Sequence, residues 1–317
     1  FYSNSVIIPI QSRLAEKIGT VSGKQDFQLF LCNSGAEANE NAIKLASFHT
    51  KKKKNICFTK AFHGRTAAAV AATDNKSIIA PTNESDNFIF VPFNNTTALE
   101  EAFKNHEISS VIIEGIQGVG GVQIPEVSFL EKIRSLCDEH EAVFICDEIQ
   151  SGYGRTGKFF AHQHAQVQAD IITIAKGMGN GFPVGGVLIA PKFQAKHGLL
   201  GTTFGGNYLA CAASIAVLET IEKENLLQNA TDLGNYLYEE LKNDPLIQEI
   251  RYQGLMFGIE LKVSCAPLRN KLLSEFNILT GNASCPKTLR ILPALNITKI
   301  ELDAFIHAFK ILSKSNL

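Results

Sequence analysis

The sequence lacks an excess of charge of either sign, because 30 basic residues stand against 31 acidic ones. A protein that binds the phosphate backbone of nucleic acids needs a large basic face to neutralise it. The sequence also lacks an apolar run of about 20 residues, the length that spans a bilayer. Its first residues show neither a basic segment before an apolar stretch nor a cleavage site. These absences argue against a nucleic-acid partner and a membrane protein, and they predict a cytoplasmic location.

The seven cysteines lack the CxxC spacing of metal-binding and redox motifs, and an odd number does not make a disulfide framework. Several lie within apolar runs, as Cys146 does in VFIC. We therefore expect buried thiols of a reducing compartment and no metal site. Internal repeats, low-complexity tracts and flexible linkers are missing too. No initiator Met precedes Phe1 and Tyr2, so we expect the true N-terminus to be absent from this sequence.

Short apolar runs rich in β-branched residues alternate with amphipathic helical patterns over most of the chain, which predicts a mostly parallel central sheet with helices on both faces. The helical patterns include residues 36–49 and 126–140. Seven strands are expected, at residues 28–32, 56–59, 88–91, 110–114, 142–147, 170–175 and 186–190.

The pattern changes after Gly206, where a long helical region reaches about residue 242. Two strand-like runs follow at residues 248–252 and 256–261, and then a helix, a strand and a helix. A chain of 317 residues that is 45% hydrophobic can bury two cores. The sequence therefore predicts a large α/β domain, residues 1–243, and a smaller α+β domain, residues 244–317.

Two of the predicted strands end in residues that can carry chemistry. Asp147 follows the run VFIC directly, and Lys176 follows the run DIITIA. A glycine-rich stretch begins after Lys176. Ligands bind beyond the carboxyl ends of the strands in open α/β sheets, so an acid and a lysine are expected to face one crevice. Either residue alone is more often just the point where a strand meets water, and their joint occurrence carries the argument.

Two nucleotide-binding motifs match residues 152–158 (GYGRTGK) only in part. A P-loop needs Ser or Thr after its lysine to hold the metal, but Phe159 follows here, and the acid and the loop would share one strand. The GxGxxG match opens no amphipathic helix, and no acid ends a following strand at the expected distance. The sequence therefore favours neither interpretation.

Pyridoxal phosphate makes demands that the sequence can meet. It needs a lysine for a Schiff base, a carboxylate for the pyridine nitrogen, donors for its phosphate and an aromatic face. Ser34, Gly35 and Ala36 lie between a strand and a helix, where main-chain N–H groups and the helix dipole attract a phosphate. Ser34 and Glu37 also form the pattern of an S-x-x-E capping box, which alone would favour a purely structural role.

The sequence resembles the class III aminotransferases, and within them the acetylornithine aminotransferases and their relatives that act on terminal amines. The resemblance covers essentially the whole chain, although family members are longer at the N-terminus. It implies the aspartate-aminotransferase-like fold, also called fold type I. The matching motifs are residues 33–40 (NSGAEANE), 62–66 (FHGRT), 147–152 (DEIQSG), 154–157 (GRTG), 175–177 (AKG), 181–183 (GFP), 203–207 (TFGGN), 254–258 (GLMFG) and 289–290 (LR).

The resemblance implies pyridoxal 5'-phosphate as the cofactor and gives catalytic roles to Lys176, which forms the Schiff base and moves the proton, and to Asp147, which pairs with the ring nitrogen. It also implies a homodimer whose active sites are shared across the interface, because the phosphate is contacted from the partner subunit. The remaining cofactor-binding residues that it implies are Ser34, Gly35 and Ala36 for the phosphate, Phe62 for the ring face, Gln150 for the ring hydroxyl and Thr203 for the phosphate of the partner's site.

Two arginines resemble the substrate-binding residues of the family. Arg65 matches the residue for the substrate carboxylate, and Arg290 matches the one that binds the α-carboxylate of glutamate or 2-oxoglutarate. The implied reaction moves the terminal amine of N-acetylornithine to 2-oxoglutarate, a step of arginine biosynthesis. N-succinylornithine, ornithine, 4-aminobutyrate and diaminopelargonate are alternative substrates. A catalytically silent binding protein on the same fold is the alternative of another class, and the joint presence of Lys176 and Asp147 argues against it.

Three positions depart from the family pattern: Gly115 where many relatives have Pro, Val119 where many have Glu, and Tyr208 where Pro is usual. The Glu of those relatives pairs with the arginine that matches Arg290 while an amine is bound, and Val119 cannot do so. Either another acid neutralises Arg290, or the amine substrate carries a second carboxylate, as N-succinylornithine does. The departure at Tyr208 is expected to concern packing only.

Overall fold

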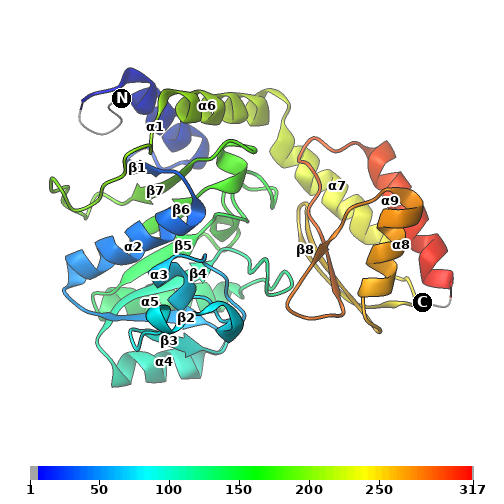
Figure 1. Cartoon of the computed structure of the whole chain (residues 1–317), viewed down its shortest axis with the longest axis horizontal. Helices are drawn as coiled ribbons and strands as arrows, with labels where there is room; N and C mark the ends of the chain where they lie inside the picture. Colours follow the sequence, from blue (N-terminus) through cyan, green and yellow to red (C-terminus); the bar gives the residue numbers. More distant parts are fainter. Residues whose placement is uncertain (1–5, 316–317) are drawn as a thin grey trace.

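The computed structural model describes residues 6–315, so Phe1 and Tyr2, which suggested a missing N-terminus, lie outside the described residues. The chain forms two lobes, and the helices α6 (Tyr208–Lys223) and α7 (Leu226–Leu241) connect them (Figure 1). Within the described residues, no helix is both long and apolar enough to cross a membrane.

The larger lobe is built on a seven-stranded sheet with the strand order β1-β7-β6-β5-β4-β2-β3. Only β7 runs antiparallel to its neighbours, which confirms the mostly parallel sheet. Each strand lies within two residues of its predicted position at either end. The strands are β1 (Gln28–Cys32), β2 (Lys54–Phe58), β3 (Phe88–Val91), β4 (Ile108–Glu114), β5 (Val143–Asp147), β6 (Ile171–Ile174) and β7 (Gly185–Ile189).

The helices of the larger lobe bury their apolar stripes against this sheet. The helix α2 contacts β4, β5, β6 and β7, and α5 contacts β4 and β5. The strands β4, β5 and β6 are buried along their whole length. Their sequences are therefore nearly continuous apolar runs, without the alternation of a half-exposed strand. The helices are α1 (Pro9–Ser22), α2 (Gly35–Thr50), α3 (Ala67–Ala71), α4 (Thr96–Asn105) and α5 (Val127–Glu139), with the 3-10 helices η1 (Lys76–Ile78), η2 (Pro81–Asn83), η3 (Ala161–Ala165) and η4 (Lys176–Met178).

The smaller lobe has its own antiparallel sheet, with the order β10-β11-β9-β8, and its own hydrophobic core. The sequence predicted this α+β arrangement. The helices α8 and α9 pack together beside the sheet (Figure 1). The elements are β8 (Ile247–Gln253), β9 (Met256–Leu261), α8 (Ala266–Phe276), β10 (Gly281–Asn282), β11 (Thr288–Ile291) and α9 (Lys299–Lys314).

The helical region expected up to residue 242 is two helices, because Asn225 adopts a left-handed backbone conformation with φ of 51°. Beyond this break, Leu226 still belongs to the core of the larger lobe, whereas Leu237 and Leu241 of the same helix belong to the core of the smaller one. The domain boundary after residue 243 stays a prediction.

The seven cysteines all lie in the described part of the chain, and none of them forms a disulfide. Six are buried, as expected, and Cys285 is half-buried. Burial raises the pKa of the Cys57 and Cys137 thiols well above the ordinary value, so both behave as small apolar side chains.

The tight packing of β5 predicts a large cost for truncating its central aromatic residue. Phe144 is 0% exposed, whereas Phe90 on the edge strand β3 is 36% exposed. We expect Phe144→Ala to lower the free energy of unfolding by about 3–5 kcal/mol, because it removes buried surface and leaves a cavity. Phe90→Ala should cost about 1 kcal/mol. Urea unfolding measures both, and equal losses would contradict this account of the core.

Candidate active site

The strand register places three polar side chains in one row at the carboxyl edge of the large sheet. Glu114 at the end of β4 is paired with Asp147 at the end of β5, and Asp147 is paired with Thr173 on β6. Lys176 follows at the start of η4. The structure therefore brings this acid and this lysine to the same edge of the sheet, as the sequence predicted.

A cavity of about 480 Å³ opens at this edge. Eight of the ten residues that the sequence assigned to cofactor or substrate line it. Those residues are Ser34, Gly35, Ala36, Phe62, Arg65, Asp147, Gln150 and Lys176. Val119, Ile149 and Glu114 complete much of the wall. The two predicted residues that are not part of its lining are Thr203 and Arg290.

The carboxylate of Asp147 is buried and is held by donors from three parts of the chain. Asn39 Nδ2 of α2 donates to Oδ2 at 2.7 Å, and the main-chain N–H of Ile149 donates to Oδ1 at 3.0 Å. His63 Nδ1 lies 2.8 Å from Oδ2. Asp147 therefore presents a fixed, hydrogen-bonded carboxylate to the cavity that it lines. His63 Nε2 is buried without a hydrogen-bond partner in the described structure.

Asn39 fixes this arrangement by bridging two strands. Its Nδ2 also donates to the main-chain carbonyl of His63 at 2.7 Å, and its Oδ1 accepts from Thr173 Oγ1 at 2.8 Å. Asn39 and His63 were part of the quoted motifs, but no role was assigned to either. Their positions beside Asp147 come from long-range contacts, which residue spacing along the chain does not reveal.

Lys176 stands at a strained point of the backbone, with φ of 45° in the left-handed region. Its side chain reaches the cavity that Asp147 also lines. Desolvation lowers the pKa of the Lys176 amine, the charges of Asp147 and Glu114 oppose this, and the nearby Arg290 adds to it. A larger neutral fraction makes this amine a better nucleophile and base than an ordinary lysine.

The start of α2 is capped as the sequence suggested. Ser34 is the N-cap, and its Oγ accepts from the main-chain N–H of Glu37 at 3.2 Å. The Glu37 carboxylate bonds to the N–H of Asn33 at 3.0 Å. In the described residues, no acceptor pairs with the N–H groups of Gly35 and Ala36, both of which line the cavity. Capping and anion binding therefore coexist, because they use different donors of the same helix end.

Arg290 lies on β11 of the smaller lobe and reaches across to the larger one. Its Nη1 donates to Gln150 Oε1 at 3.2 Å, and its Nε donates to the carbonyl of Asn282. No carboxylate lies within 4.0 Å of it in the part of the chain that the structure describes. Val119 lines the cavity instead of an acid. Arg290 is thus a cation with neutral partners, held at the mouth of the site.

Glu114 is a site residue that the sequence interpretation missed. It is 5% exposed, and its two oxygens accept from the N–H groups of Phe62 and Gly118, each at 3.0 Å. Desolvation raises the pKa of Glu114 to about 7, with His63 lowering it and Asp147 raising it. The signal was available, because Glu114 ends an apolar strand just as Asp147 does.

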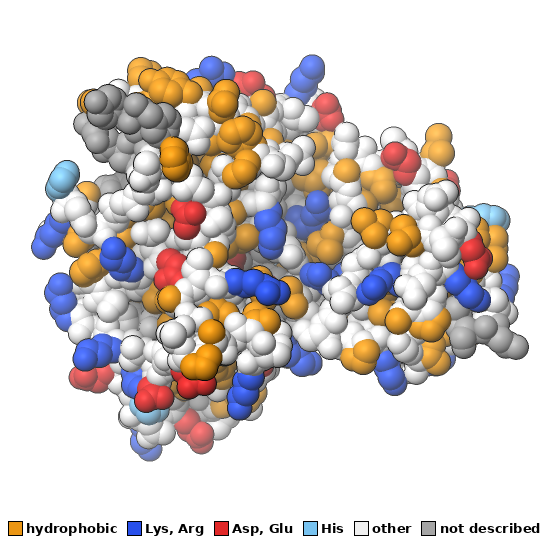
Figure 2. All heavy atoms as spheres, in the orientation of Figure 1, with side chains coloured by type: hydrophobic (Ala, Val, Ile, Leu, Met, Phe, Trp, Pro, Cys, Tyr) orange, Lys and Arg blue, Asp and Glu red, His pale blue; other side chains and the backbone are white. Residues whose placement is uncertain are grey.

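Thr203 and Tyr208 lie outside the cavity, on an exposed stretch before and at the start of α6. Tyr208 is 58% exposed, and the expectation that this departure concerns packing only stays a prediction. Phe204 and Leu209 beside it are 62% and 69% exposed. Hydrophobic side chains gather over this end of the larger lobe, where α1 and the start of α6 lie (Figure 2).

Comparison with known proteins agrees with the geometry. Residues 4–312 match the family model of the class-III aminotransferases. The chain is a class III aminotransferase. The acetylornithine aminotransferase of Nitrosomonas europaea is 39% identical to it over 96% of this chain and 80% of that protein. The acetylornithine aminotransferase of Bacillus subtilis is 41% identical over 95% of this chain and 79% of that protein.

Solved structures lead to the same fold. The ornithine aminotransferase of Toxoplasma gondii, described with partial occupancy of PLP at its active site, superposes with a TM-score of 0.90 and 28% identity. The alignment covers 98% of this aminotransferase and 78% of that chain. The predicted fold, family and enzyme class are therefore confirmed.

Pyridoxal phosphate is the cofactor of this aminotransferase class, and the residues present fit it. The two unpaired N–H groups at the start of α2 suit its phosphate, and the buried carboxylate of Asp147 suits its protonated ring nitrogen. Phe62 and Ile149 provide apolar surface in the cavity wall. Lys176 provides the amine.

The raised pKa of Glu114 predicts a pH-dependent effect of its replacement. The folded protein keeps this proton above the ordinary pKa of 4.5, so wild-type stability falls as pH rises from there to about 7. Gln cannot ionise. We expect the unfolding free energy of Glu114→Gln, relative to wild type, to rise by about 3 kcal/mol between about pH 4 and about pH 8. Urea unfolding across this range measures it, and a pH-independent difference would refute the assignment.

Proposed function

We propose that this enzyme transfers the terminal amine of N-acetylornithine to 2-oxoglutarate, with glutamate as the product, as in arginine biosynthesis. The observation that carries this proposal is the single cavity that Lys176, Asp147 and the start of α2 line together. The curated relatives named above support the choice of an N-acylated ornithine.

The proposed roles follow the chemistry of each side chain. Lys176 holds the cofactor covalently, and Asp147 pairs with its ring nitrogen. Gln150 approaches the ring hydroxyl, and Phe62 lies against the ring. The phosphate is bound by Ser34, Gly35 and Ala36, with Thr203 of the partner subunit as a further donor.

The bound cofactor supplies an electron sink for the bonds around the substrate carbon. This sink needs a protonated ring nitrogen, and the buried Asp147 carboxylate, positioned by its three hydrogen-bond partners, would pair with that nitrogen. Lys176 would move the proton at the substrate carbon, because burial lowers the pKa of its amine and so favours the neutral form that acts as a base.

Two arginines provide positive charges that can bind the carboxylates of the substrates. Arg65 lines the cavity, is exposed to it, and makes no ion pair with a described residue. Arg290 has only neutral partners, Gln150 and Asn282. An arginine without a carboxylate partner favours substrates that bring one, as 2-oxoglutarate does. N-succinylornithine is the second candidate amine because it carries an additional carboxylate and Val119 cannot neutralise Arg290. The names of the relatives favour the acetyl compound.

We also propose a homodimer and a cytoplasmic location. Phe204, Tyr208 and Leu209 follow Thr203 in the sequence and are exposed, and Thr203 is not part of the cavity of its own chain. Several large exposed apolar side chains close together in a chain are typical of a subunit interface. Seven free cysteines, all within the described residues, suit a reducing compartment.

The dimer is tested by a charge placed on this surface. Leu209, the second residue of α6, is 69% exposed, and Ile300, the second residue of α9, is 81% exposed. We expect Leu209→Glu to raise the dimer dissociation constant at least roughly 100-fold, because it buries an unpaired charge. Ile300→Glu is the matched control and should leave the constant unchanged. Sedimentation equilibrium measures both, and a dimer that tolerates Leu209→Glu places the interface elsewhere.

The catalytic assignment is tested at Lys176. We expect Lys176→Ala to lower kcat at least roughly 1000-fold, because the variant loses both the covalent tether and the base. Lys176→Arg should not restore activity, since a guanidinium keeps the charge but remains protonated. Lys158→Ala, at an exposed lysine outside the cavity, is the control. Turnover of N-acetylornithine with 2-oxoglutarate by Lys176→Ala at the wild-type rate is incompatible with the proposal.

The substrate is tested with a panel of amines. We expect the highest kcat/KM with N-acetylornithine, and lower values with N-succinylornithine, ornithine, 4-aminobutyrate and diaminopelargonate. A higher kcat/KM for N-succinylornithine would assign the unpaired Arg290 to the second carboxylate of the amine. No turnover with any of the five would favour a silent binding protein on this fold.

A further inference from the structure

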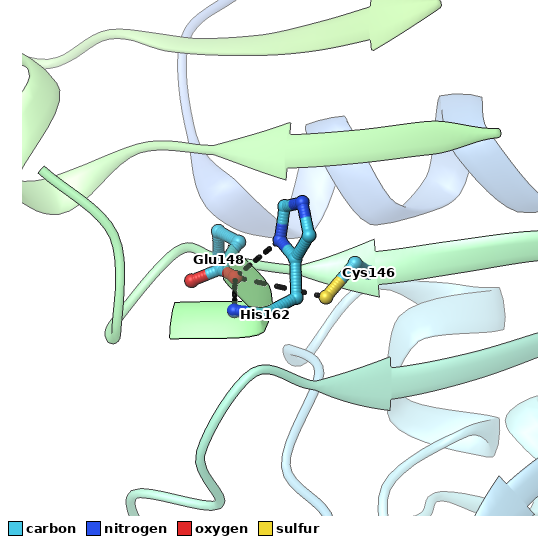
Figure 3. Close-up of side chains that lie close together, drawn as sticks. All are labelled: Cys146, Glu148 and His162. Carbon is cyan, nitrogen blue, oxygen red and sulfur yellow. Dashed lines mark hydrogen bonds and ion pairs between the residues drawn. The ribbon is translucent and has the colours of Figure 1, made fainter. Parts of the chain in front are cut away.

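A buried cluster of three polar side chains lies at the carboxyl end of β5, and two of them flank Asp147 in the sequence (Figure 3). Cys146 comes from β5, Glu148 follows that strand, and His162 belongs to η3. These residues are 0%, 1% and 1% exposed. One potential metal-ligand atom of each residue lies within 4.8 Å of the other two. Among the described residues, no other group of three or more His, Cys, Asp or Glu side chains is close enough to hold a metal ion.

The hydrogen bonds of Glu148 account for this cluster without a metal. Oε1 accepts from the main-chain N–H of His162 at 2.9 Å and lies 2.7 Å from His162 Nδ1. Oε2 accepts from Ser151 Oγ at 2.6 Å and from the N–H of Ala161 at 3.0 Å. Both oxygens are therefore saturated by donors, and a metal would have to displace them.

The protonation states agree with this interpretation. Burial acts to raise the pKa of Glu148, but the hydrogen bond and charge of His162 outweigh it and lower the pKa below its ordinary value. Burial raises the pKa of the Cys146 thiol well above its ordinary value. An ionised carboxylate paired with a histidine, beside a protonated thiol, is a hydrogen-bonded unit instead of a ready set of metal ligands. His162 Nε2, on the other side of the ring, is buried without a hydrogen-bond partner among the described residues.

Gly115 leaves the space that this carboxylate occupies. A Cβ atom at Gly115 would lie 2.7 Å from Glu148 Oε1 and 2.8 Å from both Cδ and Oε2. Separations under 3.0 Å essentially never occur for a real Cβ atom. The main-chain N–H of Gly115 also donates to the carbonyl of Asp147 at 3.0 Å, so β4 cannot move away freely. In this structure, a Cβ atom at this position would therefore meet the Glu148 carboxylate where it now lies.

Glu148 also stabilises the turn whose residues line the cavity. Its carbonyl accepts from the N–H of Gly152 at 2.9 Å, while its carboxylate holds Ser151 of the same turn. Between these two bonds lie Ile149 and Gln150, which both line the cavity. A displaced carboxylate would therefore shift the turn, and with it the residues next to Asp147.

We infer that Glu148 is a positioning residue of the active site, and that His162 holds it in the space that Gly115 leaves open. The inference rests on the proposed function, because it assumes that Asp147 and Gln150 contact the cofactor. Glu148 does not touch the cofactor itself. Its effect should appear as the affinity with which the chain retains pyridoxal phosphate.

The test is a titration of cofactor-free protein with pyridoxal phosphate, followed by the visible absorption of the lysine-bound form. Gly115→Ala should weaken binding at least roughly tenfold, because it displaces the turn that carries Gln150. In a Glu148→Ala background the same substitution should have little further effect, since no carboxylate is left to displace. Equal weakening by Gly115→Ala in both backgrounds would overturn the inference.

A second pair of variants keeps the test decisive if Gly115→Ala does not fold. His162→Phe keeps an aromatic ring against Phe160, whose ring now stacks on His162 at 5.5 Å, but removes the donor. His162→Asn keeps an N–H donor near the position of Nδ1. We expect the first to weaken binding at least roughly tenfold and the second to restore most of the affinity. Equal affinities of the two variants would overturn the inference.

Two further outcomes distinguish an error in the proposed function from an error in the positioning role of Glu148. Wild-type protein that binds pyridoxal phosphate without the visible band of a lysine-bound form contradicts the proposed function, whatever the variants do. Wild-type protein that contains stoichiometric zinc as purified, and loses it in Cys146→Ser, overturns the positioning role and assigns the cluster to a metal.

Discussion

The buried Asp147 carboxylate is the constraint on which the rest of the site depends. A carboxyl group at this depth needs hydrogen-bond partners, and Asn39, His63 and the N–H of Ile149 provide them. These donors come from α2, from the segment after β2 and from the turn after β5, so one side chain ties three parts of the fold together. The order of the sheet brings the same carboxylate beside Glu114 and close to Lys176.

The chemistry follows from how this edge of the sheet distributes charge. Two carboxylates and a lysine line one cavity, and desolvation acts on Glu114 and Lys176. It raises the pKa of Glu114 and lowers that of Lys176, so burial favours the neutral form of both groups. Asp147 has more hydrogen-bond partners than Glu114, so its carboxylate is fixed in place. The lysine amine, with its lowered pKa, is suited to proton exchange.

The sequence was informative where a pattern is local. Runs such as VFIC and DIITIA marked β5 and β6 and placed Asp147 and Lys176 at their ends, since buried parallel strands are continuously apolar. Glu114 obeys the same rule and was overlooked. The break at Asn225 was not visible, because an apolar helical period continues on both sides of it. The contact of Glu148 with His162, 14 residues away, depends on how a loop folds back, which no periodicity encodes.

The two lobes contribute different groups to the proposed substrate site. Lys176 belongs to the larger lobe and Arg290 to β11 of the smaller one, and Gln150 of the larger lobe accepts a hydrogen bond from Arg290. A molecule that reacts at the amine and binds the guanidinium would therefore connect the two lobes. The separation of these two groups would then limit the length of the substrates that fit.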